Sequence, residues 1–78
     1  MENIERLKKA FSEALEISID TITDELAYGN KTWDSVAHLA LVASIETEFD
    51  IMLASDDVID MSSFLKAKEI LQKYDIKF

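Results

Sequence analysis

The chain has 78 residues, enough for a single domain spanning residues 1–78 and too few for a deep enzymatic cleft. Sixteen Asp and Glu oppose eight Lys and Arg, and the formal net charge of −8 repels nucleic-acid phosphates and anionic membranes. Because 49% of the residues are hydrophobic, the acidity belongs to a folded domain and not to a disordered chain. We expect a monomer with protein partners, without nucleic acid or membrane binding.

Cysteine and targeting signals are missing from this sequence. Without cysteine there can be no disulfide and no thiolate metal site. Residues 1–6 lack the basic start and apolar run of a signal peptide, and no apolar segment approaches the roughly 18 to 20 residues of a membrane span. We expect a cytoplasmic protein.

The first part of the chain predicts one helix and then a long loop. One glycine and no proline favour helices, and apolar residues recur at helical spacing over residues 3–16. Residues 17–33 lack a partner for a strand and are expected to form an ordered loop with a turn at Tyr28-Gly29-Asn30. We expect this loop to send four apolar side chains into the core: Ile17, Ile19, Ile22 and Leu26.

The second helix is predicted from Ser35 to about Phe49, with Asp34 as its N-cap. It carries two apolar stripes. One consists of Leu41, Val42, Ile45 and Phe49, with His38 among them; the other consists of Val36, Leu39, Ala40 and Ala43. A helix that is apolar on two faces in so small a domain indicates that one face is reserved for a partner.

A short helical turn and a last helix follow. Ser55-Asp56-Asp57 is expected to cap the short turn, and the last helix is expected from about Ser63 to Tyr74. Its inward residues are predicted to be Phe64, Ala67, Ile70, Leu71 and Tyr74. The predicted fold is therefore all-α: a small four-helix bundle, with three longer helices, one short helix and a long first loop.

The negative charge is concentrated in the middle of the chain. Residues 32–65 hold seven acidic residues and no Lys or Arg, a net charge of −7. An ordinary solvated acidic face is one interpretation. Acidic residues around an exposed apolar stripe also suit docking onto basic partners, and their coincidence here favours a recognition surface.

The sequence patterns do not favour a metal site or a catalytic site. The run Asp56-Asp57-Val58-Ile59-Asp60 lacks the alternating acids and central glycine of a calcium loop, so no metal site is expected. Asp34, Ser35 and His38 superficially suggest a catalytic triad, but neighbouring residues of one helix cannot easily place the imidazole between the other two. We expect no catalytic residues, and we expect His38 to be a partly buried helix residue with a satisfied hydrogen bond.

Ser35 is the strongest candidate for chemistry. It begins the predicted second helix, where unpaired N–H groups and the positive end of the helix dipole favour a phosphate ester. It also follows a long loop, which should leave it accessible. The weaker interpretation is a helix-tolerant serine next to a cap.

The chain resembles an acyl carrier protein. The matching residues are Asp34-Ser35-Val36 and the acidic close of the second helix, Ile45-Glu46-Thr47-Glu48-Phe49-Asp50, and the resemblance extends from Ile4 to about Tyr74. It implies a covalent 4′-phosphopantetheine on Ser35, with Asp34 supporting the transferase and its magnesium ion. It also implies acyl intermediates held as thioesters, in fatty acid or polyketide biosynthesis.

The resemblance further implies partners and a docking face. A phosphopantetheinyl transferase and acyl-loading and acyl-using enzymes are expected, and a sheltered acyl chain would enter near Ile45, Phe49 and Ile59. The expected docking residues are Val36, Leu39, Ala40, Ala43, Glu46 and Glu48.

The departures from the family pattern keep other branches open. Ala37, Ala40 and Thr47 stand where carriers of primary fatty-acid synthesis commonly have acids, which favours a specialised biosynthetic pathway. An aminoacyl or peptidyl carrier shares the Asp-Ser motif. From another class, the alternative is an unmodified helical interaction module, and an enzyme built on Ser35 and His38 is the most distant one.

Overall fold

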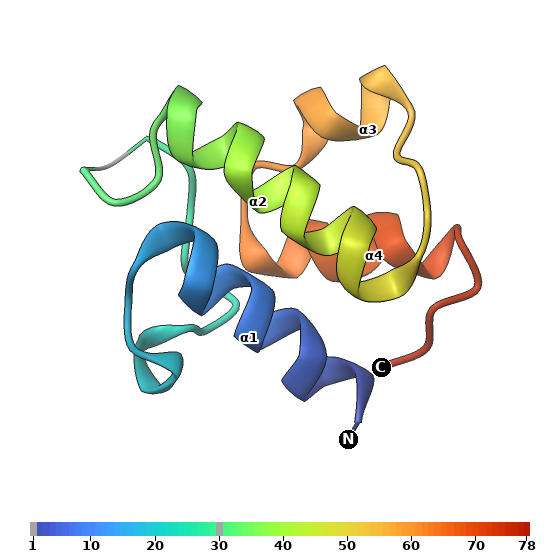
Figure 1. Cartoon of the computed structure of the whole chain (residues 1–78), viewed down its shortest axis with the longest axis horizontal. Helices are drawn as coiled ribbons and strands as arrows, with labels where there is room; N and C mark the ends of the chain where they lie inside the picture. The colour runs from blue at the N-terminus through green and yellow to red at the C-terminus, as the bar shows by residue number, and fades with distance from the viewer. Residues whose placement is uncertain (1, 30) are drawn as a thin grey trace.

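The computed structural model describes residues 2–29 and 31–78, and the regular structure of these residues is helical. It comprises α1 (Asn3–Leu15), the 3₁₀ turn η1 (Ile19–Thr21), α2 (Ser35–Phe49), α3 (Ser55–Asp60) and α4 (Phe64–Gln72). The four-helix bundle with three longer helices and one short one is thus confirmed. In Figure 1, α1 and α2 lie next to one another, α4 lies behind α2, and the two chain ends lie close together.

The core forms where α1, α2, α4 and the end of the first loop meet, and a cluster of three aromatic rings lies in it. The ring of Phe11 from α1 meets Trp33 edge-on at a centroid distance of 5.3 Å and Phe64 of α4 at 5.0 Å. All three aromatic side chains are buried. Such edge-to-face pairs add to the hydrophobic gain of burying three large rings, so this cluster joins three separate segments of the chain.

Trp33 has a larger role than the sequence analysis assigned to it. It is the largest fully buried side chain among the described residues, and its ring stacks on that of His38 at 6.0 Å. Since Asp34 is the N-cap of α2, Trp33 and His38 occupy the two positions of a hydrophobic staple. The staple fixes the direction from which the loop enters α2.

The first loop contributes less to the core than predicted. Ile22 is buried, and Ile17 and Leu26 pack partly against the core. The prediction for Ile19 was wrong: it is 48% exposed, because it begins the 3₁₀ turn η1, which leaves its side chain toward solvent. Of the expected turn at residues 28–30, Gly29 has a φ of +108°, which suits glycine, whereas Asn30 lies outside the described residues.

An isolated antiparallel bridge ties the loop to the start of α4. It pairs Ala27 with Ser63, and two hydrogen bonds surround it: Tyr28 N–H donates to Ser62 O, and Phe64 N–H to Leu26 O, both at 2.9 Å. The loop therefore has a defined place against the connection between α3 and α4.

The cap of α3 differs from the prediction. Its N-cap is Ala54, which makes no side-chain capping bond, and Asp57 is instead buried. Lys73 Nζ donates to Asp57 Oδ1 at 2.5 Å and Tyr74 Oη to Asp57 Oδ2 at 2.6 Å. These hydrogen bonds, that of Lys73 first, lower the pKa of the Asp57 carboxyl and outweigh the opposing effect of burial. Asp57 thus fastens α3 to the end of α4.

α4 agrees with its prediction apart from its end. Ser63 caps it by accepting the Lys66 N–H at 3.0 Å. Its buried residues are Phe64, Ala67, Ile70 and Leu71. In the described part of the chain, no helix has the length and apolar character needed to cross a membrane.

Candidate functional site

Ser35 is the first residue of α2 and is exposed. Asp34 caps the helix as predicted, because its Oδ1 accepts the Ala37 N–H at 2.9 Å and its carbonyl accepts the His38 N–H at 2.8 Å. The cap therefore holds the Ser35 hydroxyl at an accessible helix N-terminus.

The Ser35 hydroxyl has a partner that the sequence analysis missed. Tyr28 Oη lies 2.8 Å from Ser35 Oγ, and either atom can donate the hydrogen. The two residues belong to the first loop and to α2, and no local sequence pattern links them. Only the fold of the loop, held at Ser62 through the Tyr28 backbone, brings them together.

His38 is partly buried and uses both of its ring nitrogens. Trp33 Nε1 donates to Nδ1 at 2.9 Å, and Nε2 lies 2.8 Å from the carbonyl oxygen of Val58. An indole N–H only donates and a carbonyl only accepts, so the Nε2-protonated neutral ring satisfies both contacts. The prediction of a satisfied helix histidine is confirmed, and its bond to Val58 connects α2 to α3.

This arrangement does not assemble a nucleophile with a base. Ser35 pairs with Tyr28, His38 pairs with Trp33 and Val58, and Asp34 caps the helix. A serine nucleophile needs a base within hydrogen-bond reach that is itself oriented by a third group. Within residues 2–29 and 31–78, no three His, Asp or Glu side chains gather as metal ligands would.

A pocket of about 390 Å³ adjoins Ser35. This volume is within the range of small-molecule sites. Hydroxyl groups and apolar side chains share its lining, and none of the described lining residues is Asp, Glu, Lys or Arg: Tyr28, Ser35, His38, Leu39, Val58, Ile59, Met61 and Ser62. Of the three residues expected near a sheltered chain, Ile59 lines this pocket, whereas Ile45 is fully buried in the core and Phe49 lies under Arg6.

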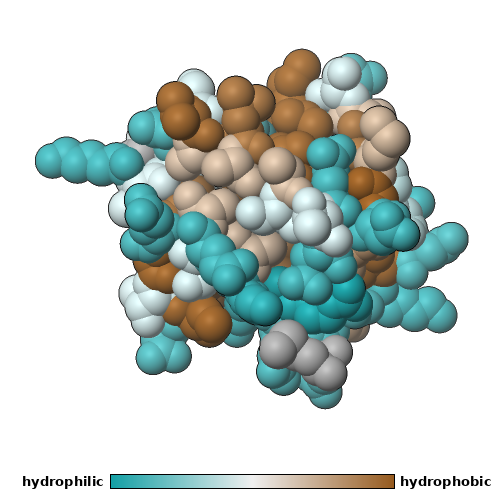
Figure 2. Space-filling view, in the orientation of Figure 1, coloured by the Kyte–Doolittle hydropathy of each residue, from teal (hydrophilic) through white to brown (hydrophobic). Residues whose placement is uncertain are grey.

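The second apolar stripe of α2 is on the surface. Val36 is 78% and Leu39 67% exposed, and Ala40 and Ala43 are also exposed. In Figure 2, tan and brown atoms gather over α2 and along the edge above it. An exposed apolar strip of this kind has no role in the core.

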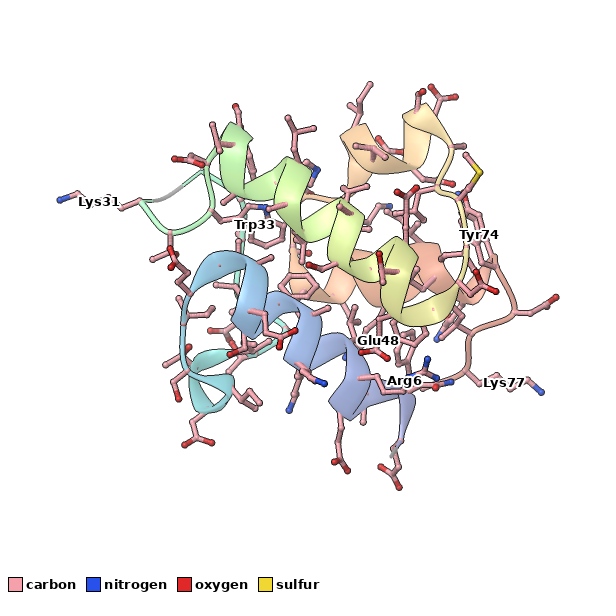
Figure 3. The ribbon with its side chains drawn as sticks, viewed as in Figure 1. Arg6, Lys31, Trp33, Glu48, Tyr74 and Lys77 are labelled. Carbon is pink, nitrogen blue, oxygen red and sulfur yellow. The ribbon has the colours of Figure 1, made fainter. Side chains whose placement is uncertain are left out.

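The two acidic residues predicted to flank this stripe have partners inside the protein. Glu46 Oε2 accepts the Leu53 N–H at 2.9 Å, and Glu48 Oε2 lies 3.2 Å from Arg6 Nε. Figure 3 shows Arg6 and Glu48 coming together from α1 and α2, and the guanidinium lies 4.7 Å from the centre of the Phe49 ring. Their role in docking stays a prediction, and it would compete with these contacts.

No protein-family model matches the sequence, and no curated protein is significantly similar to it. The functional conclusion therefore depends on Asp34-Ser35-Val36, on the resemblance these residues carry, and on their surroundings. Those surroundings are an exposed serine at a capped helix start, a tyrosine hydroxyl in contact with it, and an adjoining uncharged pocket.

Proposed function

We propose that this protein is an acyl carrier: it holds acyl intermediates as thioesters on a 4′-phosphopantetheine arm at Ser35 and delivers them to partner enzymes in the cytoplasm. The observation that carries the proposal is the exposed Ser35 hydroxyl at the capped start of α2, next to an uncharged pocket. Attachment joins Ser35 Oγ to the phosphorus of coenzyme A that bears the pantetheine group. The pyrophosphate bond breaks, and the serine proton and adenosine 3′,5′-bisphosphate are lost.

The residues around Ser35 fit such an arm. In the first turn of α2, Asp34 Oδ1 accepts the Ala37 N–H, and the N–H groups before it have no acceptor within the helix. Together with the helix dipole, these groups favour a phosphodiester. Tyr28 Oη is within reach of the same position. The arm supplies the thiol that a chain without cysteine lacks.

The surface supports protein partners with a basic docking site. Val36 and Leu39 form an exposed apolar strip beside Ser35, within a segment, residues 32–65, that has seven acidic residues and no Lys or Arg. Opposite charges speed the encounter, and the apolar strip supplies contact area. We assign this surface to the transferase and to acyl-loading and acyl-using enzymes, in a specialised biosynthetic pathway.

The test is the intact mass after incubation with coenzyme A and a broad-specificity phosphopantetheinyl transferase. We expect one added phosphopantetheine group, and none in Ser35→Ala. Ser55→Ala is a matched control, because Ser55 is also exposed and also the first residue of a helix. If the wild type stays unmodified under conditions that load another carrier, the proposal fails.

Failure to load would favour the unmodified interaction module, for which the exposed Val36 and Leu39 side chains are the specific observation. In either case Val36→Asp should weaken partner binding, while its effect on stability stays within about 0.5 kcal/mol because the site is exposed.

An aminoacyl or peptidyl carrier differs from an acyl carrier only in its cargo. Incubating the loaded protein with an acyl-activating or an aminoacyl-activating enzyme separates these two branches by mass.

A further inference from the structure

The hydrogen bond between Tyr28 and Ser35 has a consequence for the modified protein. We propose that Tyr28 is a positioning residue for the Ser35 phosphodiester. Its hydroxyl contacts Ser35 Oγ before modification and donates to a phosphodiester oxygen afterwards. This inference depends on the function proposed above.

Tyr28 is held in place although its side chain is 45% exposed. Its backbone N–H donates to Ser62 O at 2.9 Å. Its ring makes T-shaped contacts with the rings of Trp33 and His38, at centroid distances of 6.2 Å and 5.6 Å and interplanar angles of 80° and 78°. Trp33 is fully buried and His38 is bonded at both nitrogens, so the two rings against which Tyr28 packs are themselves fixed. The hydroxyl is therefore preorganised, which lowers the entropy cost of a new hydrogen bond.

Modification changes what the tyrosine hydroxyl can bind. Unmodified, Ser35 offers a hydroxyl that can donate or accept. Once esterified, Ser35 Oγ has no hydrogen, and the strongest acceptors at this position are the charged phosphodiester oxygens. A hydrogen bond from a phenol to such an oxygen is charge-assisted and roughly twice as strong as a neutral one.

The pocket lining offers few competing donors. None of its described residues is Lys or Arg, and His38 is engaged by Trp33 and Val58. Tyr28 is the lining side chain already in contact with Ser35 Oγ. Its donation keeps the phosphate on the side of Ser35 where the pocket lies.

This contact also links loading to the stability of the first loop. Through its backbone, Tyr28 is attached to Ser62 in the connection between α3 and α4. A stronger bond to the modified Ser35 would join the loop, the start of α2 and this connection more firmly. Loading should therefore raise the melting temperature, and part of that rise should depend on the tyrosine hydroxyl.

The test uses Tyr28→Phe, which keeps the ring and removes the hydroxyl. Tyr74→Phe is the matched control, because the hydroxyl of Tyr74 bonds to Asp57 and to Ala54 N–H, away from Ser35. After loading, we expect the ³¹P chemical shift of the phosphodiester to be the same in wild type and Tyr74→Phe and to move in Tyr28→Phe. The rise in melting temperature on loading should shrink only in Tyr28→Phe.

A second measurement needs no variant. With tyrosine labelled at ¹³Cζ, loading the wild type should shift the Tyr28 resonance and leave that of Tyr74 unchanged. Suppose that Ser35 is loaded, but the ¹³Cζ resonance of Tyr28 does not move on loading and the ³¹P shift is the same in wild type and Tyr28→Phe. This inference is then overturned while the carrier function stands. If Ser35 is not loaded at all, both are overturned.

Discussion

Both stripes of α2 are apolar, but their surroundings differ. In the first stripe, Leu41, Val42 and Ile45 are buried. In the second stripe, Val36 and Leu39 are mostly exposed, and Leu39 lines the pocket next to Ser35. The apolar residues of the first stripe are explained by folding, since they bury surface against the rest of the domain. Val36 and Leu39 gain little from the core, which points to a contact outside the chain.

The polar contacts of α2 differ between its two ends. Near the end of α2, Glu46 and Glu48 hold the chain segment after the helix and Arg6 of α1. Near its start, the exposed Ser35 hydroxyl contacts the hydroxyl of an exposed tyrosine, Tyr28. Acidic residues of one helix can thus serve the fold at one end, while the other end presents an accessible hydroxyl.

The largest expected effect compares two leucines of the same helix. Leu41 is fully buried and Leu39 is 67% exposed. We expect Leu41→Ala to lower the free energy of unfolding by about 2–5 kcal/mol, because it leaves a cavity. Leu39→Ala should change it by less than about 0.5 kcal/mol. Urea unfolding followed by circular dichroism measures both, and equal losses in the free energy of unfolding would remove the distinction between the two stripes.

The next effect concerns His38, which joins the start of α2 to α3. His38→Ala removes the acceptor of the Trp33 indole N–H and the donor to Val58 O. We expect a loss of about 1–3 kcal/mol in the free energy of unfolding. The exposed neighbour Leu39→Ala serves as the control. A His38→Ala protein as stable as that control would mean that these two hydrogen bonds do not support the pocket wall.

A smaller effect is expected at the other end of α2. Arg6 pairs with the Glu48 side chain, donates to the Glu48 carbonyl and lies over the Phe49 ring. Since these groups are partly exposed, Arg6→Ala should cost about 1 kcal/mol. Urea unfolding of Arg6→Ala, Glu48→Gln and the double variant measures the coupling, and purely additive losses would show that the ion pair contributes nothing.

The smallest effect is a pH dependence of stability at Asp57. This residue fastens α3 to the end of α4, and the next residue, Val58, contacts His38. The pKa of Asp57 is lowered from its ordinary value of 3.8 in the fold, so its stabilising contribution is complete above that pH and is lost as the pH falls below it. The pKa of Lys73 is raised above 10.5, so its contribution is lost at high pH. Lys73 is 61% exposed, which screens the pair and keeps the effect small.

The measurement compares wild type with Asp57→Asn in urea at about pH 6 and about pH 3. The difference in stability between the two proteins should narrow at the lower pH. The comparison between variants matters because acid also reduces the net negative charge of the whole chain. A difference that is the same at both pH values would exclude a titrating Asp57 as its source.

The helices could be predicted because their signals are local. The range of α2 and its cap Asp34 follow from the spacing of apolar residues and from a capping residue just before them, and the structure confirms both. Ser63, expected as the first residue of the last helix, is its N-cap. The staple between Trp33 and His38 is also a local signal, and the position of Trp33 just before the cap could have revealed it.

The remaining features depend on contacts between distant segments. Asp57 in a first helical turn is indistinguishable by sequence from a capping residue, and its partners Lys73 and Tyr74 lie beyond the next helix. Tyr28 meets Ser35 only because the loop folds back against Ser62. The prediction for Ile19 failed for the opposite reason, because a local 3₁₀ turn leaves exposed a side chain that the predicted loop was expected to bury.

The bridge between Ala27 and Ser63 also bears on the order of folding. It pairs residues far apart in the chain, so the entropy of closing the intervening segment must be paid before the pairing gains anything. We therefore expect the bridge to form late, after α1 and α2 have docked, and the Tyr28 and Phe64 amides to exchange with deuterium only through global unfolding. Ser35 and Tyr28 then meet only in the finished fold, and under the function proposed above a transferase that reads this geometry would modify the folded protein and not a nascent chain.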